Sequence, residues 1–301
     1  MHFVVLPWKW KHLKNEFVCC IKRKTDGIIC VHWIWVGVTC HVVDYLGNRL
    51  KMNSVFVSEI SKMISIGASQ VAACIGMNPF KTQQQLLVSI WAKYPKLFPN
   101  KHAVTEEMHV EQLILKSGLE LTDIETHAGN VDQIVLDELV QKKISETNLL
   151  FTDDQQKQVS TYIQSKANTI QGTRFEHATA QKAPPGKVWE VDSTFYRKPL
   201  CKKGQMSFQL VGKIDRVEIE DGTRTLVEIK NRVKKLFREV RDYEQIQIQC
   251  YLQLTGMNKA KLVEEYKKGN EMHTIEIEKN QDMWETVILP KLIEFCEKTL
   301  E

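Results

Sequence analysis

The sequence predicts an α/β fold in which helices flank a central mixed β-sheet, and three observations support this prediction. Apolar residues recur at helical spacing up to about residue 181, and alternating apolar and polar residues follow from about residue 189. Asp221-Gly222 supplies the turn of a β-hairpin. A chain of 301 residues with 43% hydrophobic content is also long enough to bury one substantial core.

Helices dominate the first part of this region. They are predicted over residues 55–63, 69–75, 82–96, 152–171 and 174–181, with one or two more in 104–149 interrupted near Gly129 and Asn130. Ser69 is the predicted N-cap of the second helix, which Gly76 and Pro79 end. Asp153 and Asp154 suit the first turn of the helix that begins beside them.

Strands dominate the part that follows. They are predicted over residues 189–196, 207–219, 225–232, 261–266 and 273–277, with further helices over 240–254 and 281–300. We find no internal repeat and no low-complexity linker. Helices, a strand meander, another helix and more strands, in this order, predict an α/β core with a mixed sheet.

Residues 1–51 differ in composition from the rest of the chain, because they hold four of the seven Trp and four of the eight Cys. Three interpretations fit: a β-rich extension, an anchor at a membrane interface, or residues translated upstream of a true start at Met52. The third is favoured, since a recognisable pattern begins after Met52. Residues 28–43 are apolar but short for a membrane span, so no stable membrane association is expected. The expected organisation is an atypical extension over 1–51 and one domain over 52–301.

Charge is distributed unevenly, although the net charge is only +4. Residues 105–155 hold twelve acids and three Lys, whereas residues 194–243 hold thirteen Lys and Arg and seven acids. A nucleic-acid backbone would meet the basic region, unless both regions are simply solvated faces. The eight Cys form no CxxC pair, which favours a reduced intracellular protein and gives no basis for a zinc site.

Glu228 and Lys230 carry the strongest chemical signal. They alternate with Val227 and Ile229 on a predicted strand, so the two charged side chains share one face. Asp215, on the preceding hairpin strand, comes alongside Glu228 in a suitable register, and two adjacent carboxylates need a cation between them. A hard divalent ion such as Mg²⁺ meets that need and binds phosphate. A solvent-exposed ion-pair ladder is the alternative, because Glu-x-Lys alone is a weak signal.

The joint pattern around these residues resembles a nuclease family. The runs Gly212-Lys213-Ile214-Asp215, Val227-Glu228-Ile229-Lys230 and Gln245-Ile246-Gln247 resemble the PD-(D/E)xK nuclease superfamily, and within it the YqaJ-type viral recombinase and lambda exonuclease family. Residues 66–82 and 172–176 are similar to that family's opening motif and its glycine-to-glutamate helix motif. The resemblance covers residues 60–300 and implies a restriction-endonuclease-like core. Residues 83–170 exceed the family's usual spacing and are interpreted as a helical acidic insertion.

The resemblance implies a role for each residue that matches a family motif. Lys230 would be the catalytic lysine, and Gln247 would contact the lysine region or nucleic acid from its helix. The implied cofactor is one or two Mg²⁺ or Mn²⁺ ions per site. The implied metal ligands are Asp215, Glu228, the backbone carbonyl of Ile229 and, directly or through water, Glu176.

Contacts to DNA phosphates follow from the same resemblance and from charge. Ser69 would hold a terminal phosphate with help from Lys62, and helix capping alone is the alternative for Ser69. Basic residues after the catalytic strand would contact backbone phosphates without reading sequence. These residues are Arg232, Lys234, Lys235, Arg238 and Arg241.

The sequence therefore predicts a metal-dependent deoxyribonuclease, and the resemblance implies a 5′-to-3′ exonuclease acting on duplex DNA ends in recombination or DNA processing. A RecB-like or structure-specific nuclease is one alternative. A catalytically silent DNA-binding or assembly module is another. The resemblance also implies a homo-oligomer and a single-strand annealing partner, whereas nothing in the sequence identifies the host or decides between nucleus and cytoplasm.

Overall fold

Two compact units make up the chain in this computed structural model, one over Met1–Met63 and one over Ile64–Glu301. The described backbone of the first unit forms an antiparallel sheet of β1 (Val4–Val5), β2 (Glu16–Arg23), β3 (Gly27–Val36) and β4 (Thr39–Val43), in that order. From residue 62 onward the structure describes all residues except 102, 123–125, 127–132, 148–150, 234 and 267–269. Within the described part, no helix has both the length and the apolar character needed to cross a membrane.

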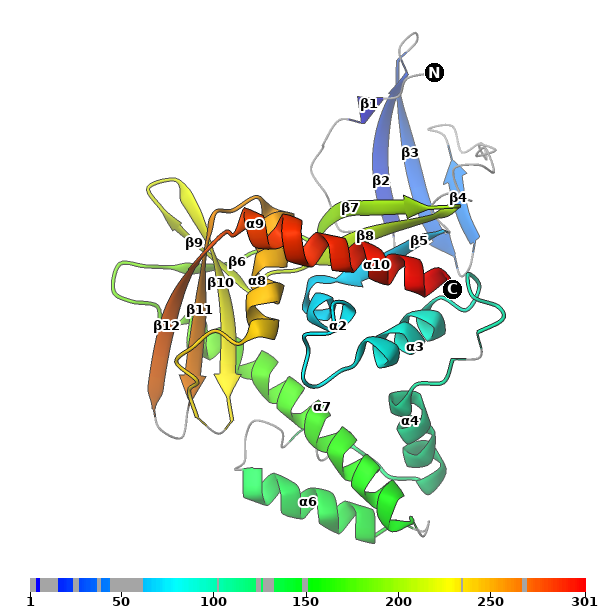
Figure 1. Ribbon diagram of the computed structural model, residues 1–301, viewed down its shortest axis with the longest axis vertical. Helices are drawn as coiled ribbons and strands as arrows, with labels where there is room; N and C mark the ends of the chain where they lie inside the picture. The colour runs from blue at the N-terminus through cyan, green and yellow to red at the C-terminus, as the bar shows by residue number, and fades with distance from the viewer. Residues whose placement is uncertain are drawn as a thin grey trace. The chain divides into compact units, whose positions relative to one another are not determined.

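The largest sheet of the second unit is mixed and has the order β12-β11-β10-β9-β6 (Figure 1). Its strands are β6 (Trp189–Val191), β9 (Arg216–Glu220), β10 (Thr223–Arg232), β11 (Lys259–Tyr266) and β12 (Glu271–Glu278). Only β10 and β11 run parallel within it. Parallel neighbours need a crossover, which helix α8 (Asp242–Thr255) supplies. This mixed sheet with flanking helices confirms the predicted fold class.

The hairpin between β9 and β10 turns at the predicted dipeptide. Asp221 has φ of 50° and Gly222 has φ of 76°, so both central residues adopt the left-handed conformation that this kind of two-residue turn requires. The turn sets the register in which Arg216 faces Val227. That register decides which side chains of the two strands meet.

A second sheet separates two segments that the sequence analysis had joined. It has the order β5-β8-β7, with β5 (Met63–Gly67), β7 (Tyr196–Lys203) and β8 (Met206–Gly212). The single strand predicted over 207–219 is therefore wrong, because the chain leaves this sheet after Gly212 and enters the other at Arg216. A Cβ at Gly212 would lie 2.7 Å from the Tyr251 ring, so only glycine allows this close approach to α8. The strand predicted over 189–196 likewise divides into β6 and the start of β7.

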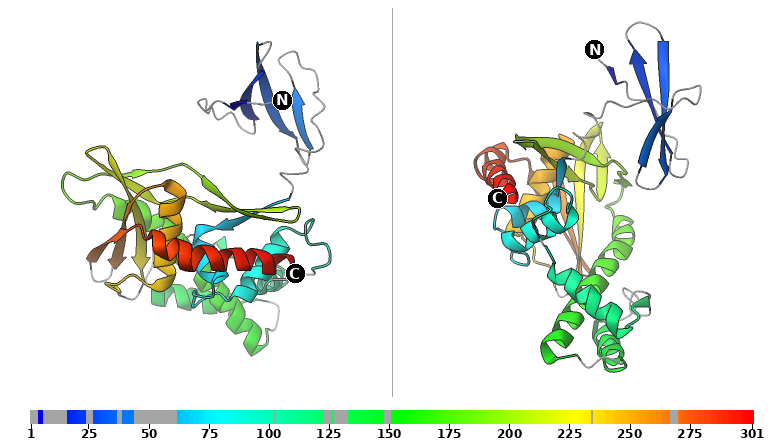
Figure 2. Two further views of the ribbon diagram at one scale, coloured as in Figure 1. Left: turned by 45° about the horizontal axis from the view of Figure 1, so that its top comes forward. Right: turned by 90° about the vertical axis from the view of Figure 1, so that its right-hand side faces the viewer.

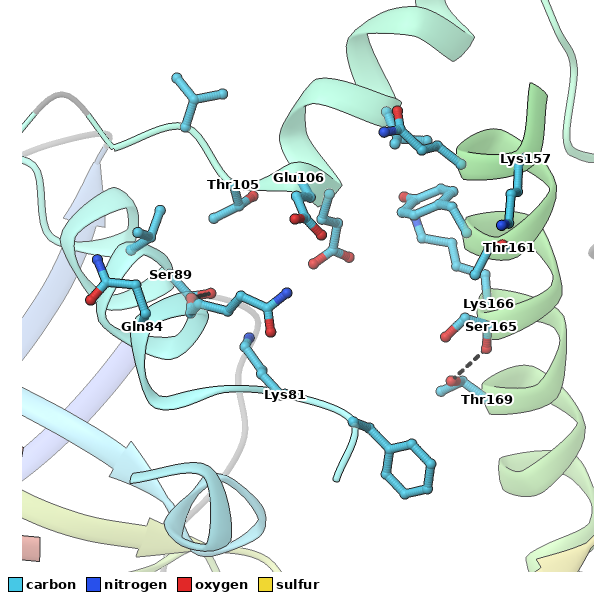
Figure 3. A pocket seen from close by; sticks show the side chains of 18 of the residues that line it. Lys81, Gln84, Ser89, Thr105, Glu106, Lys157, Thr161, Ser165, Lys166 and Thr169 are labelled. Atoms are coloured by element: carbon cyan, nitrogen blue, oxygen red, sulfur yellow. Dashed lines mark hydrogen bonds between the residues drawn. The ribbon is translucent and has the colours of Figure 1, made fainter. Parts of the chain in front are cut away.

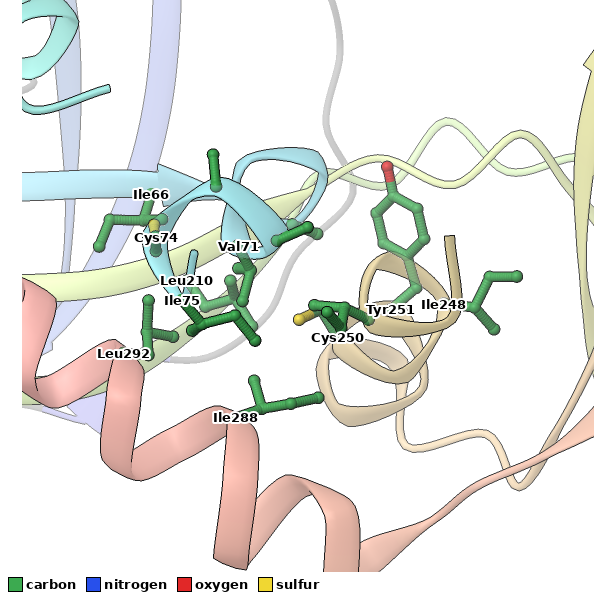
Figure 4. Packing of buried hydrophobic residues seen from close by; sticks show 14 of the residues in the cluster. Ile66, Val71, Cys74, Ile75, Leu210, Ile248, Cys250, Tyr251, Ile288 and Leu292 are labelled. Carbon is green, nitrogen blue, oxygen red and sulfur yellow. The ribbon is translucent and has the colours of Figure 1, made fainter. Parts of the chain in front are cut away.

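The main hydrophobic core lies where α8 meets helix α2 (Val71–Cys74), β8 and the C-terminal helix α10 (Leu289–Leu300). Figure 4 shows Cys250 of α8 pointing toward Val71 of α2, with Leu292 of α10 below them. Burial of such side chains contributes about 1.5–3 kcal/mol each relative to exposure. The core therefore fixes α8, and with it the side chains that α8 presents to β10.

Most of the helices predicted from apolar spacing are present, but the predicted bounds are wrong in two places. Besides α2, the α-helices that the structure describes before β6 are α3 (Gln83–Lys93), α4 (Glu106–Ser117), α6 (Gln133–Ser145) and α7 (Asp153–Ala180). The two helices predicted over 152–171 and 174–181 are one, since Gly172 continues α7 and a single helical glycine costs only about 1 kcal/mol. The helix predicted over 55–63 lies outside the described residues except at its end, where Met63 begins β5.

Helices α4, α6 and α7 share a small core of their own. Val110 and Leu113 of α4 pack with Val140 of α6 and with Val159 and Ile163 of α7. Figures 1 and 2 show the three helices grouped together, with the C-terminal part of α7 reaching β10. One long helix thus connects this helical group to the central sheet.

Candidate active site

Asp215 lies in the short connection between β8 and β9, beside β10. Its Oδ2 accepts a hydrogen bond of 3.0 Å from the Ile229 amide. Because Arg216 faces Val227 in the ladder, Asp215 comes alongside Glu228, in the register that the sequence hypothesis required. Burial raises the pKa of the Asp215 carboxyl even though the Ile229 amide opposes that change.

Glu228 and Lys230 project from the face of β10 that is turned toward α8. Lys230 Nζ donates a hydrogen bond of 2.7 Å to Glu228 Oε1, and Glu228 is only 2% exposed. Burial raises the pKa of Glu228, and the nearby Asp215 carboxylate raises it further against the opposing charge of Lys230. Burial alone would lower the pKa of Lys230, but the Glu228 carboxylate outweighs it and the pKa is raised. A charged lysine thus faces two crowded carboxyl groups.

Gln247 connects α8 to this pair. Its Nε2 donates a hydrogen bond of 2.8 Å to Glu228 Oε1 and one of 3.3 Å to the Tyr251 hydroxyl. The sequence analysis missed Tyr251, although its position four residues after Gln247 places both side chains on one helical face. Lys230 and Gln247 together hold one oxygen of Glu228 and so fix the orientation of its carboxylate.

Glu176 approaches from α7. Its Oε1 pairs with Arg216 Nη2 at 3.1 Å, and Arg216 is 6% exposed. The negative charge of Glu176 contributes to the raised pKa of Asp215, so the two carboxylates lie within electrostatic range. The sequence analysis did not identify Arg216. Its position directly after Asp215 was the one feature of the sequence that could have indicated its place near the site. Glu176 is therefore near the site but already engaged by a buried cation.

Polar contacts on the other face of β10 anchor the C-terminal part of α7. Thr179 Oγ1 lies 2.9 Å from Asn231 Oδ1 and also hydrogen-bonds the Glu265 carboxylate. Lys182 pairs with Glu265 at 2.5 Å, and Asn231 donates a hydrogen bond of 3.1 Å to the Gly172 carbonyl. These contacts fix α7 on both sides of Glu176.

The Arg232 side chain is held by two buried carboxylates. Its guanidinium pairs with Glu244 at 2.7 and 3.0 Å and with Glu264 at 2.6 Å, and both glutamates are buried. Glu264 also accepts a hydrogen bond of 2.8 Å from the Arg238 amide. Because its side chain is only 11% exposed, Arg232 forms an internal clamp between β10, β11 and α8, and its contact with phosphate stays a prediction.

The other predicted phosphate contacts after β10 lie on the segment before α8. Lys235 and Arg238 are exposed, and Arg241 is half-buried. Arg238 pairs with Glu271 at 2.9 Å, and Arg241 pairs with Glu239 at 3.2 Å. Exposed pairs of this kind exchange partners at little cost, so these cations stay available to phosphate. Lys234 lies outside the described residues.

Ser69 of the opening motif makes no described side-chain contact with the cluster. Ser69 is exposed, and it is not the N-cap that the sequence analysis predicted. Gly67 is the N-cap of the short helix Ala68–Gln70, and its amide donates a hydrogen bond of 2.9 Å to the Gln70 side chain. Lys62 is half-buried on the preceding segment.

The donor set at this site fits a divalent cation. Glu228 Oε2 is buried and has no hydrogen-bond partner among the described residues, and Asp215 lies beside it. An unpaired buried carboxylate oxygen is costly unless a cation meets it. No group of three His, Cys, Asp or Glu side chains in the described part of the chain is arranged for metal binding, so backbone carbonyl or water would complete the coordination.

Comparison with known proteins gives one family match and several distant structural likenesses. The sequence profile of the PD-(D/E)XK nuclease superfamily matches residues 102–288. No curated protein sequence matches. Among solved structures, an alkaline exonuclease from Laribacter hongkongensis is similar at 13% identity and a TM-score of 0.41, covering 81% of this chain and 92% of that one. A phage-related exonuclease from Haemophilus somnus 129PT is similar at 9% identity and a TM-score of 0.37, covering 78% and 93%.

Both structural likenesses are too distant to indicate an activity. The profile match is different, because it spans more than half of the chain and includes every residue of the cluster around Glu228. The chain therefore belongs to the PD-(D/E)XK nuclease superfamily.

Proposed function

We propose that this protein is a Mg²⁺- or Mn²⁺-dependent deoxyribonuclease that degrades duplex DNA from a 5′ end. One observation carries the metal-dependent part of the proposal. The Asp215 and Glu228 carboxyl groups are held side by side, and one buried oxygen of Glu228 has no protein partner among the described residues. Superfamily membership supports hydrolysis of a nucleic-acid phosphodiester as the reaction.

Each residue of the cluster has a role that its contacts support. Asp215, Glu228 and the Ile229 carbonyl would hold the ion, which when bound supplies charge neutralisation at the scissile phosphate and activation of water. Lys230 is held 2.7 Å from Glu228 Oε1 and would donate to the attacking water or to the charge that develops on phosphate. Gln247 keeps the Glu228 carboxylate in one orientation.

Glu176 has an assisting role in this proposal. Its pairing with Arg216 would have to loosen for a direct contact with the ion, so a water-mediated contact agrees better with the observed geometry. Arg216 would then keep Glu176 near Asp215 while the site is empty of substrate.

The DNA backbone would reach the site over the exposed basic residues before α8. Lys235, Arg238 and Arg241 are proposed phosphate contacts, as are Lys62, Ser69 and Lys234. Such contacts contribute affinity without sequence preference, and the affinity should fall steeply with salt. A homo-oligomer and a single-strand annealing partner stay predictions.

Polarity and end preference rest on the resemblance to the YqaJ-type and lambda exonuclease family. The test is digestion of end-labelled linear duplex and of closed circular DNA with Mg²⁺, with EDTA as the control. An exonuclease releases label from the 5′ end of the linear substrate and leaves circles intact. Efficient cutting of circles would instead indicate a structure-specific endonuclease.

Glu228→Ala tests the site itself. We expect the variant to lose metal-dependent cleavage, because the ion loses a ligand and Lys230 loses its partner. Unchanged cleavage would show that the site is assigned wrongly. A wild-type protein that binds DNA but never cleaves it would favour the silent binding module.

A further inference from the structure

A second feature of the described chain shares helix α7 with the site and is not used by the proposed chemistry. It is a cleft of about 970 Å³ between α3, with the segment before it, and the first half of α7, with the start of α4 at its rim. Figure 3 shows Lys81, Gln84 and Ser89 on one side facing Thr161, Ser165 and Thr169 of α7 on the other. This cleft is of the size of ligand-binding pockets in proteins.

The lining combines cations, neutral donors and one exposed ring. Lys81 lies on one side of the cleft and Lys157 on the other, and neither forms an ion pair with any described residue. Lys166 adds a third positive charge, although it pairs with Glu111 at 3.4 Å. Glu106 and Glu107 are the acids of the lining, and both belong to the α4 rim. The hydroxyl and amide groups between the lysines are of the kind that contact phosphate and sugar.

Phe80 stands out in this lining, because it is 78% exposed. The Asn78 side chain accepts hydrogen bonds from the Phe80 and Lys81 amides at 2.8 and 3.1 Å, so the segment that carries both residues is fixed. A base in a duplex is already stacked on its neighbours. An exposed, fixed ring therefore favours unpaired bases, which gain stacking when they meet it.

Helix α7 and one ring contact connect the lining of the cleft to the elements that carry the candidate active site. On α7, Tyr162 and Thr169 line the cleft, and Glu176 follows Thr169 at the same spacing of seven residues, which is about two helical turns on one face. The Phe80 ring packs edge-on against Tyr243 of α8 with centroids 5.5 Å apart. Tyr243 lies one turn before Gln247, which contacts Glu228.

We infer that this cleft binds single-stranded DNA and guides one strand to or from the candidate active site. Phosphates lie against Lys81 and Lys157, and a base stacks on Phe80. The inference rests on the proposed function for the direction of the strand, whereas binding of an unpaired strand can be measured without any cleavage. It also gives the helical insertion over 83–170 a role, because α4 and most of α7 belong to it.

The test is fluorescence anisotropy of a labelled oligonucleotide of about 12 nucleotides with the full chain in EDTA, where hydrolysis does not occur. Lys81→Glu combined with Lys157→Glu should weaken binding at least about tenfold and reduce the salt slope by about 1.4, which corresponds to two phosphate contacts on a single strand. Phe80→Ala should weaken binding by at least about fivefold. Lys116→Glu and Leu115→Ala, exposed on α4 outside the cleft, are the matched controls and should change it by less than about twofold.

Equal binding by the cleft variants and the controls would overturn the inference, and so would the absence of binding by the wild type. Photocrosslinking of the wild type to an oligonucleotide containing 5-iododeoxyuridine gives an independent readout. The crosslink should map to the peptide that contains Phe80, and a crosslink only outside the cleft would contradict the inference. If the protein does not cleave DNA in the presence of metal, the proposed function is refuted. The binding measurements in EDTA then still decide whether the cleft binds a single strand.

Discussion

Arg232 pairs with two buried glutamates, so we expect a large loss of folding stability when the positive charge of Arg232 is removed. Arg232→Met keeps most of the side-chain volume but leaves Glu244 and Glu264, 1% and 0% exposed in their side chains, without their cation. Removing one partner of a buried pair costs about 3–5 kcal/mol, because the remaining charge stays buried. For a unit of this size that lowers the Tm by roughly 6–20 °C.

Arg238→Met is the matched control, since it removes the same type of Arg–Glu pair from the surface. Arg238 and Glu271 are 2.9 Å apart, but their side chains are 64% and 47% exposed. Exposed pairs contribute about 0–1 kcal/mol, so the control should remain close to the wild type in a urea denaturation followed by Trp fluorescence.

Equal losses for the two variants would refute the argument from burial. A stable Arg232→Met variant with weakened DNA binding would be a different result. It would show that Arg232 contacts phosphate, as the sequence analysis first predicted.

Three further predictions concern single side chains. Lys230→Met should lower kcat by at least about a hundredfold while DNA binding in EDTA changes little, and a loss of binding alone would argue against a catalytic lysine. Thr179→Val should cost about 1–3 kcal/mol in urea denaturation, whereas Thr173→Val, exposed on the same helix, should cost less than about 0.5 kcal/mol. Although burial alone would raise the pKa of Asp192, hydrogen bonds from Thr194, Tyr196 and Arg224 lower it to about 2. Asp192→Asn should therefore cost roughly 1–2 kcal/mol at neutral pH, and the difference from the wild type should shrink as the pH falls from about 4 toward 2; a constant difference would contradict this.

Local patterns were sufficient to predict the central part of the candidate site. Strand alternation placed Glu228 and Lys230 on one face, and the hairpin turn at Asp221-Gly222 fixed the register that brings Asp215 beside them. These features depend on residues close in the sequence. They could therefore be derived before any tertiary contact was known.

Other features depend on contacts between distant residues, and the sequence analysis missed them. The role of Arg232 depends on Glu264, which belongs to a strand that follows a crossover helix. The need for glycine at position 212 depends on the approach of Tyr251 from α8. Neither contact leaves a periodic signal, because each partner lies on a different element.

The continuity of α7 illustrates a further limit. A glycine before a glutamate motif suggested a boundary, yet the Gly172 carbonyl accepts a hydrogen bond from Asn231 and the helix is anchored beyond it through Thr179. Tertiary contacts of this kind outweigh the weak helix propensity of one glycine.

The central claim is that Asp215 and Glu228 jointly bind a divalent ion. The most direct test is anomalous diffraction from crystals of the full chain soaked in Mn²⁺. We expect one peak about 2 Å from an oxygen of each carboxylate, with Lys230 beside it, and loss of the peak in Glu228→Gln. A fully occupied peak elsewhere, or no peak at saturating Mn²⁺, would contradict the account.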